Sequence, residues 1–495
     1  IYRYKVNYNS DDFPTFLSFS LYNIEYHVNP PNVEFTGTFR PPINIAGLAA
    51  YVRNFGHTPK IIDFEATILK NSEIDPEKMA AEIMEESPHV VGFSTITPRY
   101  PLIIQTARAC KKFNPKVVII LGGVHVTGEP KSVFHDSSID YAIVGEGEEP
   151  LLDLLNGLQV GRDVTTIPNL AYRNGEGEVI VNPNRPFVKD VDSLPFPAWD
   201  LLPLEKYKDE VMFYKNYMGI NTARGCAWDC NFCASNVVWK RRVRMRSAKN
   251  VVEEIRQLVG NYNINEFFFY DDTYTTNNQR VFEICNLIKQ KNLTIRYYVS
   301  IRADTLTTEL AKAMKDSGCI LALLGVESGD QAILDKTGKG ESKEEIRKAC
   351  AVMKKVGLPF SNTFIIGHPG DTHKSIQATI DFAKELDSDQ VKFMIATPFP
   401  GTHLHRMAVE QGKIKDVDPM KYDDYTCYQH VAVNLSNVSD EDLKTYQAKA
   451  YEEYDLQKRR IIPELSHPAG GRNTKEIEHN KDARAYHFTG VTNDC

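Results

Sequence analysis

Hydrophobic and polar positions alternate in two long blocks of the chain, and both blocks predict strands that take turns with helices. In residues 40 to 160, apolar runs such as HVVGFST and KVVIILGG stand between segments whose apolar residues recur every three or four positions. The pattern predicts strands at 59–64, 89–95, 116–123 and 140–145 and helices at 44–56, 75–87, 101–113 and 148–158. This order predicts a doubly wound, Rossmann-like α/β domain, in which ligands lie beyond the carboxyl ends of the strands.

The second block repeats the strand-helix alternation six times between residues 219 and 405. Six steps are typical of an incomplete (β/α) barrel, whose chemistry gathers at the carboxyl ends of its strands. The predicted organisation is a first domain at 1–160, a Pro-rich linker at 161–218, a partial barrel at 219–405 and a helical C-terminal segment at 406–495. The tail beyond 465 is polar and aperiodic, so we expect it to be loosely ordered.

Composition narrows the class of protein. With 495 residues, 42% hydrophobic and 25% charged, the chain is expected to be soluble and to hold two or three domains. Its 58 Lys and Arg against 65 Asp and Glu argue against a nucleic-acid partner and favour a small-molecule or peptide substrate. No apolar run reaches the roughly 18 residues that span a bilayer, and residues 1–30 lack a signal-peptide pattern, so a cytoplasmic location is expected.

Three of the nine cysteines crowd into TARGCAWDCNFCASN, in the loop that follows the first predicted barrel strand. Zinc usually takes four ligands in paired C-x-x-C units, and only Cys230 and Cys233 form such a pair. With Cys226 they instead suit a four-iron four-sulfur cluster that keeps one iron for an exogenous ligand, because such clusters are otherwise held by four thiolates. Zinc and a trio of unligated structural thiols remain as alternatives.

The C-x3-C-x2-C spacing, with Phe232 before the last cysteine, resembles the radical S-adenosylmethionine superfamily over about residues 215–405. The resemblance implies that the open iron chelates the amino and carboxyl groups of S-adenosylmethionine. It also implies that the reduced cluster breaks a carbon-sulfur bond to leave a 5'-deoxyadenosyl radical. Such chemistry needs an external electron donor of the flavodoxin or ferredoxin type.

Four further motifs at predicted strand ends, FFFYDDTYT, VSIRAD, LLGVESG and IIGHPGDT, are in keeping with this superfamily. A sulfonium zwitterion with a ribose and an adenine needs carboxylate, hydroxyl, guanidinium and backbone partners around the barrel mouth. Taken singly, the Asp pair could cap a turn, the Arg could form a surface ion pair and the Gly could be a turn residue. The resemblance implies these cofactor-binding residues: Phe232, Asp271, Asp272, Ser300, Arg302, Glu327, Ser328 and Gly367.

The first block resembles the cobalamin-binding domain that one branch of these enzymes carries ahead of the barrel. As a family, such domains carry D-x-H-x-x-G, S-x-L and G-G elements. This sequence keeps Ser94-Thr95-Ile96 and Gly122-Gly123 but lacks the first element, which implies cobalamin without a histidine ligand to cobalt. Ser94 can reach the cofactor's nucleotide tail, and paired glycines let the backbone approach a flat group.

His125 in GGVHVTG is expected to contact the nucleotide tail or a phosphate of the cofactor rather than cobalt. A scaffold that has lost its cofactor is the alternative for the whole domain. A dinucleotide site is less favoured, because no G-x-G-x-x-G opens a helix after a first strand.

The two resemblances together imply an enzyme with a [4Fe-4S] cluster, S-adenosylmethionine and cobalamin. The commonest reaction in that family is methylation of an unactivated carbon, in which methylcobalamin supplies the methyl group and the adenosyl radical removes a hydrogen. The substrate would lie between both cofactors, and residues 406–464 would either line its pocket or cap the barrel.

Three other functions compete with methyl transfer. Cyclisation, ring rearrangement or hydroxylation of the oxidative-cyclase type stays open, since it uses the same two cofactors. A methylthiotransferase is disfavoured, because that family carries further cluster cysteines in its N-terminal domain and Cys110 stands alone here. A cobalamin carrier or sensor would leave the cysteine loop unexplained.

Overall fold

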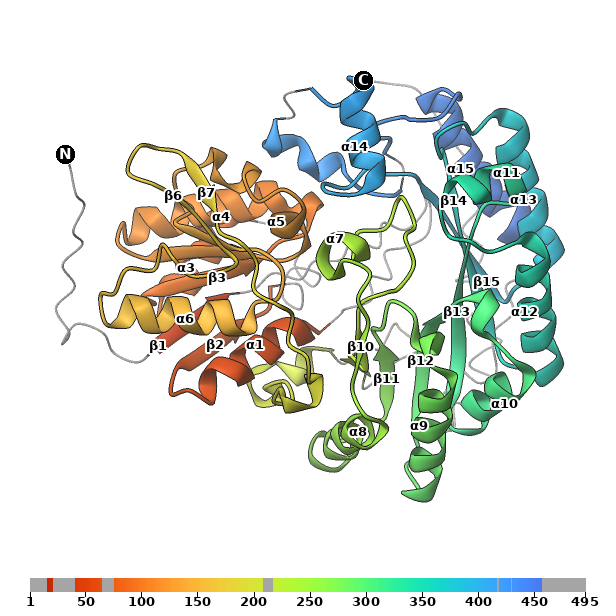
Figure 1. The fold of residues 1–495 in the computed structure, drawn as a ribbon, viewed down its shortest axis with the longest axis horizontal. Coiled ribbons are helices and arrows are strands. Elements are labelled where there is room, and N and C mark those ends of the chain that lie inside the picture. Colours follow the sequence, from red (N-terminus) through yellow and green to blue (C-terminus); the bar gives the residue numbers. More distant parts are fainter. Residues whose placement is uncertain are drawn as a thin grey trace, which may run out of the picture. The chain divides into compact units, whose positions relative to one another are not determined.

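The computed structural model describes residues 16–20, 41–64, 75–207, 217–415, 418–428 and 430–455, and Figure 1 traces their fold. In the first sheet, β3 (Val90–Ser94), β4 (Val118–Gly122) and β5 (Tyr141–Ile143) pair in parallel. The strand β1 (Phe16–Ser20) pairs in parallel with β2 (Thr58–Ile62) and contacts β3. The strand β1 therefore has β2 on one side and β3 on the other, so the order of strands reverses there, as in a doubly wound sheet. In sheets of this kind, ligands bind beyond the carboxyl ends of the strands at the reversal.

Helices cover both faces of this sheet. They are α1 (Ile43–Arg53), α3 (Pro76–Met84), α4 (Tyr100–Phe113), α5 (Val124–Gly128) and α6 (Glu148–Gln159). Successive residues Val90 and Val91 of β3 enter two separate cores, one shared with α1 and α6 and the other with α3 and α4. A central strand buried on both faces explains why its sequence reads as a continuous apolar run.

Two antiparallel strands, β6 (Leu170–Arg173) and β7 (Val179–Val181), extend the sheet beyond β5. Asn169 enters the hairpin with a left-handed φ of 67° and donates a 2.7 Å hydrogen bond from its side chain to the carbonyl of Val144. The sequence predicts a linker at 161–218 and gives no sign of this hairpin, because strands of four and three residues leave almost no alternation to detect. The domain boundaries drawn from the sequence stay predictions.

The second sheet confirms the six predicted strand-helix steps. Its six strands pair in parallel in the order β15-β14-β13-β12-β11-β8, which leaves the barrel open. The strands are β8 (Tyr217–Ile220), β11 (Glu266–Phe269), β12 (Arg296–Ile301), β13 (Cys319–Glu327), β14 (Phe360–Ile366) and β15 (Gln390–Ile395). The connecting helices are α8 (Ala248–Tyr262), α9 (Asn278–Gln290), α10 (Thr308–Asp316), α12 (Lys343–Val356) and α13 (His373–Leu386).

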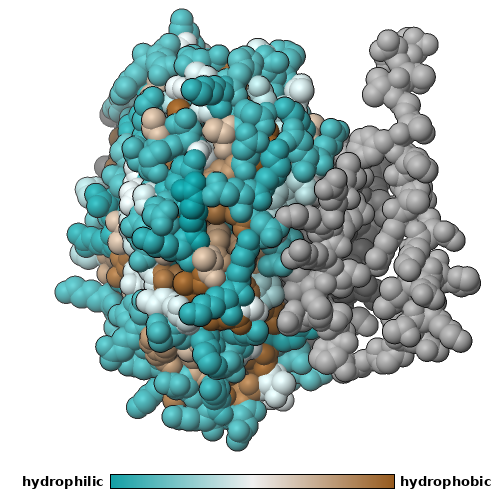
Figure 2. Space-filling model, turned by 90° about the vertical axis from the view of Figure 1, so that its right-hand side faces the viewer, coloured by the Kyte–Doolittle hydropathy of each residue, from teal (hydrophilic) through white to brown (hydrophobic). Residues whose placement is uncertain are grey.

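The helix α12 shows why these segments become helices. Ser342 and Glu345 form a capping box at its start, and Gly357 ends it with a left-handed φ of 66°. Its buried residues are three or four positions apart: Ile346, Ala349, Cys350 and Met353. One apolar stripe packs on the sheet while the opposite face stays polar. Figure 2, which faces this side of the molecule, shows a mostly hydrophilic surface.

Smaller elements sit at the ends of the barrel strands. They are β9 (Ala223–Arg224), β10 (Arg244–Met245), α7 (Ser235–Trp239), α11 (Gln331–Lys336) and α14 (His403–Glu410), with α15 (Asp440–Asp455) beside β15. Side chains of α15 replace a neighbouring strand for β15: Gln447 donates to the carbonyl of Phe393 at 2.8 Å, and the N–H of Phe393 donates to the hydroxyl of Tyr451 at 3.0 Å. Among the described residues, no helix is both long enough and apolar enough to cross a membrane.

Candidate active site

The cysteine loop runs from β9 to α7 and is held by its backbone. Gly225 has a φ of 94°, and a Cβ there would meet the carbonyl oxygen of Arg242 at 2.0 Å, so only glycine fits. The N–H of Asn231 donates to the carbonyl of Thr337 at 2.7 Å, and its carbonyl accepts from the N–H of Leu404 at 3.0 Å. These contacts fix the loop without using the three thiols, which are all partly exposed.

The thiols of Cys226, Cys230 and Cys233 remain the predicted ligands of an iron-sulfur cluster. In the described part of the chain, no three His, Cys, Asp or Glu side chains are placed to share one metal ion. Burial raises the pKa of the free Cys230 thiol to about 12, whereas the nearby Lys339 and Arg302 favour its anionic form.

Asp271, at the end of β11, clamps the start of the cysteine loop. Its carboxylate accepts from the N–H groups of Thr222 and Ala223 at 2.7 and 2.9 Å and from the hydroxyl of Thr222. Burial raises the pKa of Asp271, and Arg280, which donates to the carbonyl of Thr222 at 2.5 Å, opposes that shift. The neighbouring Asp272 accepts from Ser235 at 2.7 Å, at the first residue of α7. Direct cofactor contacts by both aspartates stay predictions.

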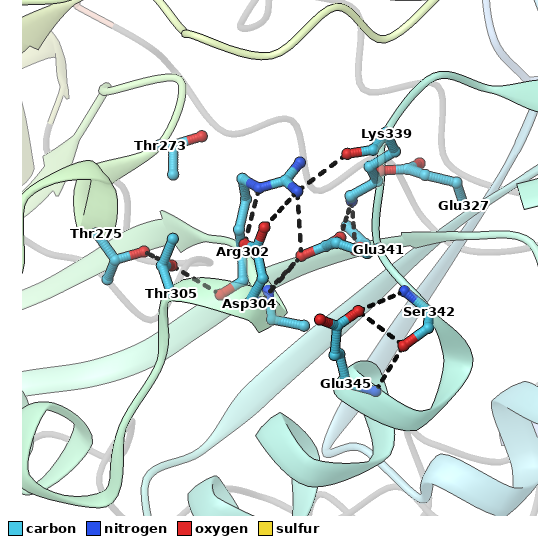
Figure 3. Close-up of polar contacts among 12 residues, drawn as sticks. Thr273, Thr275, Arg302, Asp304, Thr305, Glu327, Lys339, Glu341, Ser342 and Glu345 are labelled. Carbon is cyan, nitrogen blue, oxygen red and sulfur yellow. Dashed lines mark hydrogen bonds and ion pairs between the residues drawn. The ribbon is translucent and has the colours of Figure 1, made fainter. Parts of the chain in front are cut away.

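A network of charged side chains joins Arg302 and Lys339 to three carboxylates (Figure 3), and both cations interact electrostatically with Cys230 of the cysteine loop. Lys339 contacts Glu327 at 2.8 Å and Glu341 at 3.3 Å, while Arg302 pairs with Asp304 at 2.8 Å and donates to the carbonyl of Lys339 at 3.0 Å. Three carboxylates against two cations leave one net negative charge. S-adenosylmethionine carries one net positive charge, so the network suits it electrostatically.

Arg302 and Glu327 connect the network to the loop and to the barrel strands. The guanidinium of Arg302 lies 4.1 Å from the ring centroid of Trp228, inside the cysteine loop. Glu327 ends β13 with a left-handed φ of 68°, a strained conformation that is common at functional sites. A Cβ on Gly325 would meet the Glu327 carboxylate at 2.3 Å, so this glycine leaves room for the network.

The remaining predicted cofactor residues also lie at the carboxyl ends of the strands. Ser300 is partly buried on β12, and Ser328 lies 3.3 Å from the Thr379 hydroxyl of α13. Gly367 has a φ of 86° and donates its N–H to Asp371 at 3.0 Å. Phe232 packs beside the loop after β14. The structure brings these side chains to one end of the barrel, and their contacts with a cofactor stay predictions.

The two glycines after β4, Gly122 and Gly123, differ in how closely other atoms approach them. A Cβ on Gly122 would meet nothing within 4 Å, whereas one on Gly123, at a φ of 99°, would meet the N and O of Thr95 at 2.7 and 2.8 Å. Gly123 therefore lets this turn pack against Ser94-Thr95-Ile96. Thr95 is fully buried, and its hydroxyl has no hydrogen-bond partner among the described residues. An open glycine beside an unpaired hydroxyl fits a flat ligand at the end of β3 and β4.

His125 lies inside the protein and is 1% exposed. Its ring stands between Tyr100 and Tyr422, at centroid distances of 4.9 and 5.0 Å, and its nitrogens lie 3.2 Å from Thr97 and 3.4 Å from Ser132. Burial lowers the pKa of His125 to about 3, so the imidazole is neutral. In the structure, protein groups surround the ring. The expected contact of His125 with a cofactor tail stays a prediction.

The carboxyl ends of both sheets meet in direct contacts. Glu146, after β5, accepts from Arg224 at 2.6 Å and from Arg244 at 2.8 Å, and Glu148 accepts from Arg224 at 2.6 Å. The helix α5 packs on α7, and a Cβ on Gly128 would meet the carbonyl of Pro400 at 2.3 Å. The helix that follows the turn after Gly122 therefore packs on the helix that follows the cysteine loop.

Comparisons with known proteins agree with this arrangement. Residues 220–383 match the family model of the Radical SAM superfamily, and residues 34–155 match that of the B12 binding domain. An uncharacterized methyltransferase of Pyrococcus horikoshii is 36% identical over 430 residues, which cover 87% of this chain and 91% of the relative. The chain belongs to the B12-binding radical SAM enzymes. This radical SAM enzyme accordingly uses a [4Fe-4S] cluster, S-adenosylmethionine and cobalamin.

Other relatives of this radical SAM enzyme differ in activity. The anaerobic magnesium-protoporphyrin IX monomethyl ester cyclase of Rubrivivax gelatinosus is 28% identical over 388 residues, 77% of this chain and 69% of the relative. The solved methyltransferase TsrM from Kitasatospora setae aligns with a TM-score of 0.68 at 16% identity, covering 92% of this chain and 89% of that chain. The solved enzyme OxsB aligns with a TM-score of 0.62 at 18% identity, covering 80% of this chain and 56% of that chain. These two structures show the shared fold.

Several site residues of this radical SAM enzyme escaped sequence reasoning. Lys339 and Glu341 stand in a Gly-rich turn, TGKGE, where charged residues usually face solvent. His368 stands in IIGHPGDT, yet it is buried, its ring lies 5.7 Å from that of Phe232, and neither ring nitrogen has a partner among the described residues. Burial lowers the pKa of His368 to about 4. A signal was available, since GHPG follows an apolar strand at the reactive end of the barrel.

Proposed function

We propose that this enzyme methylates an unactivated carbon of a small molecule, or of a natural-product, lipid or peptide precursor. The contact between the two strand-end regions carries the proposal: the turn after Gly122 leads into α5, and α5 packs on α7, which follows Cys233. One substrate can therefore lie against both. The methyltransferase from Pyrococcus horikoshii, similar over most of its length, supports methyl transfer over cyclisation.

The residues of the chain divide the work of such a reaction. Cys226, Cys230 and Cys233 would hold the cluster, and Thr95 with Gly122 would receive the cobalamin tail. When bound, the cluster would supply radical formation, and cobalamin would supply methyl transfer. Glu327 is suited to the ammonium of S-adenosylmethionine, and Lys339 to its carboxylate, since both are buried and oppositely charged.

Contacts made by the C-terminal segment support the proposal that this segment helps to form the substrate pocket. Leu404 of α14 donates its N–H to Asn231 in the cysteine loop at 3.0 Å. Tyr422 lies in the short helix η8 (Pro419–Asp424), and both it and Tyr425 pack into the core of the B12 binding domain. A segment that contacts both strand-end regions is placed to close the space between them.

The test is product analysis under anaerobic, reducing conditions with methyl-labelled S-adenosylmethionine and fractionated metabolite or peptide extracts. Methylation predicts a product that gains one labelled methyl group, with near-equal amounts of S-adenosylhomocysteine and 5'-deoxyadenosine. A product without the label, formed with 5'-deoxyadenosine but no S-adenosylhomocysteine, would contradict methylation and support a cyclase-type reaction.

A further inference from the structure

A basic patch borders the exposed side of the cysteine loop. It consists of Lys240, Arg241 and Arg242 in the turn after α7, and His403 and Arg406 on α14, all of them exposed. The whole chain carries a net charge of −7, so this local surplus of cations departs from the average surface. Such a patch attracts anionic partners and speeds their association.

The patch touches the backbone that leads into the cluster ligands. The carbonyl oxygen of Arg242 stands where a Cβ of Gly225, the residue before Cys226, would lie. The side chain of Arg241 donates to the carbonyl of Ala227 at 3.3 Å. A protein that covers the patch would therefore lie directly over the first ligand of the cluster.

Few of these cations are neutralised. Asp229 lies 3.7 Å from Arg241 and 3.2 Å from His403, and Arg406 contacts the other nitrogen of His403 at 2.7 Å. Within the described ranges, Lys240 and Arg242 form no ion pair. Four Lys and Arg side chains thus face one aspartate.

The turn that carries the patch is strained. Lys240 and Arg241 adopt left-handed φ angles of 51° and 61° in succession, although neither is a glycine. Two adjacent residues of this kind cost conformational energy, and backbone strain of this kind clusters at functional sites. The strained turn keeps three consecutive cationic side chains at the surface.

Protein groups contact the loop on two other sides. Glu146 and Glu148 of the B12 binding domain bind Arg224 on one side, and Thr337 and Leu404 hold Asn231 on another. The patch, by contrast, presents exposed cationic side chains to a partner.

We propose that the basic patch docks the electron donor, an acidic one-electron carrier protein of the flavodoxin or ferredoxin class. The inference rests on the proposed function, because each cleavage of S-adenosylmethionine consumes one electron. The reduced carrier would lose that electron, through the cluster, to the sulfonium, whose carbon-sulfur bond would break to give methionine and the 5'-deoxyadenosyl radical. The radical would take a hydrogen atom from the substrate, or from the buffer when no substrate is present, to become 5'-deoxyadenosine. The carrier is acidic, and the patch is basic and contacts the residues on either side of Cys226, so charge complementarity selects this occupant.

The test measures 5'-deoxyadenosine formed by the reconstituted holoenzyme with two electron sources, reduced flavodoxin and dithionite. The double variant Lys240→Glu, Arg242→Glu should raise the KM for flavodoxin at least about tenfold and weaken its dependence on salt. Its dithionite-driven rate should stay within about twofold of wild type, because a small reductant needs no docking surface. The matched control is Lys289→Glu, Lys291→Glu at the far end of α9, where both side chains are exposed.

Three results would overturn the inference: an unchanged KM for flavodoxin, an equal loss with dithionite, or an equal loss in the control. A raised KM for an anionic substrate with dithionite, with the flavodoxin KM unchanged, would assign the patch to substrate instead. Cleavage is measured without substrate, so a failure of methyl transfer alone leaves this test intact. If the wild-type enzyme fails to cleave S-adenosylmethionine both with flavodoxin and with dithionite, that result would contradict the proposed function and this inference with it.

Discussion

Glu146 of the B12 binding domain accepts a 2.6 Å hydrogen bond from Arg224, which stands two residues before Cys226. The same carboxylate accepts from Arg244 and from the N–H of Val188, and its side chain is 9% exposed. One acidic residue therefore couples the B12 binding domain to the cysteine loop. A sequence of strands and helices alone contains no sign of this coupling, because residues 146 and 224 are distant in the chain.

We expect Glu146→Gln to lower the free energy of unfolding by about 2 to 3 kcal/mol, since it leaves the largely buried guanidinium of Arg244 without its charged partner and leaves Arg224 with Glu148 alone. Urea unfolding of the apoprotein measures this change. Asp316→Asn is the matched control, because Asp316 and Lys312 form an exposed pair that should contribute less than about 0.5 kcal/mol. Equal effects of the two variants would contradict a structural role of the Glu146 contacts.

Replacing Cys226, Cys230 and Cys233 together with Ala should abolish iron and sulfide binding after anaerobic reconstitution, because no second C-x-x-C pair exists in the chain. Iron and sulfide assays and the visible charge-transfer absorption measure the loss. Cys427→Ala, at a partly buried thiol outside the loop, should retain the cluster. Wild-type iron in the triple variant would refute the ligand set, and zinc without iron in the wild type would revive the zinc alternative.

The two glycines after β4 should respond differently to the same substitution. Gly123→Ala forces a Cβ against the backbone of Thr95 at a φ of 99°, so we expect a loss of about 1 to 3 kcal/mol in the free energy of unfolding. Gly122→Ala meets no atom within 4 Å and should leave stability nearly unchanged. If the cobalamin tail lies there, Gly122→Ala should instead weaken cobalamin binding, measured by absorption titration. Unchanged binding in a stable Gly122→Ala variant would place the tail elsewhere.

The pH dependence of stability should carry the signature of His125. Its pKa is lowered to about 3 in the folded protein, mainly by burial and then by His405, against an ordinary value of 6.5. The unfolded chain therefore binds a proton that the folded chain refuses, and stability present above about pH 6.5 is lost as the pH falls toward 3. The expected loss is about 1.4 kcal/mol per pH unit in that window.

Urea unfolding of wild type and His125→Gln at pH 7 and pH 5 isolates this contribution. The neighbours Tyr100 and Tyr422 are unchanged in both proteins, so their effects cancel in the comparison. The stability difference between the two proteins should shrink by about 2 kcal/mol at the lower pH. Parallel pH profiles would show that His125 is not held neutral by burial. A Co(II) spectrum without nitrogen splitting from an axial imidazole would separately support cobalamin without a histidine ligand.

Glu327→Gln should raise the dissociation constant for S-adenosylmethionine about ten- to a hundredfold, the equivalent of about 1.5 to 3 kcal/mol for a charge-assisted contact. Both S-adenosylhomocysteine and 5'-deoxyadenosine should fall together, because we expect one binding site to serve both uses of the cofactor. Calorimetric titration and product assays measure the two effects. Glu344→Gln, at an exposed position of α12, is the control and should change neither. Loss of one product alone would indicate two separate sites.

The fold could be predicted largely from periodicity, and the failures have a common cause. Runs such as FFFY and the spacing Ile346, Ala349, Cys350 and Met353 record burial directly, so the six barrel strands and their helices were evident. The hairpin of β6 and β7 was not, since Val179–Val181 is partly exposed and only three residues long. Local alternation cannot reveal a strand that is stabilised by its neighbour rather than by its own pattern.

In the candidate site, too, residues that are close in the sequence could be predicted, and contacts between distant residues could not. Cys226, Cys230 and Cys233 are close in sequence, and their spacing alone pointed to a cluster. The partners of Lys339 are Glu327 and Glu341, and its position over Cys230 depends on the turn after α11, which no short motif encodes. Asp271 follows a barrel strand, as the sequence predicts, but its carboxylate accepts hydrogen bonds from the backbone of Thr222 and Ala223, which no local motif indicates.

The attachment of α15 to β15 has a consequence for how the protein is made. All six barrel strands leave the ribosome before Gln447 and Tyr451 are synthesised, and until then the backbone groups of Phe393 lie on an open sheet edge. Open edges recruit strands from other chains, and nascent barrels of parallel strands fold slowly enough to meet them. The helix α15 is thus a protection against aggregation that each chain acquires only after its barrel strands have been made.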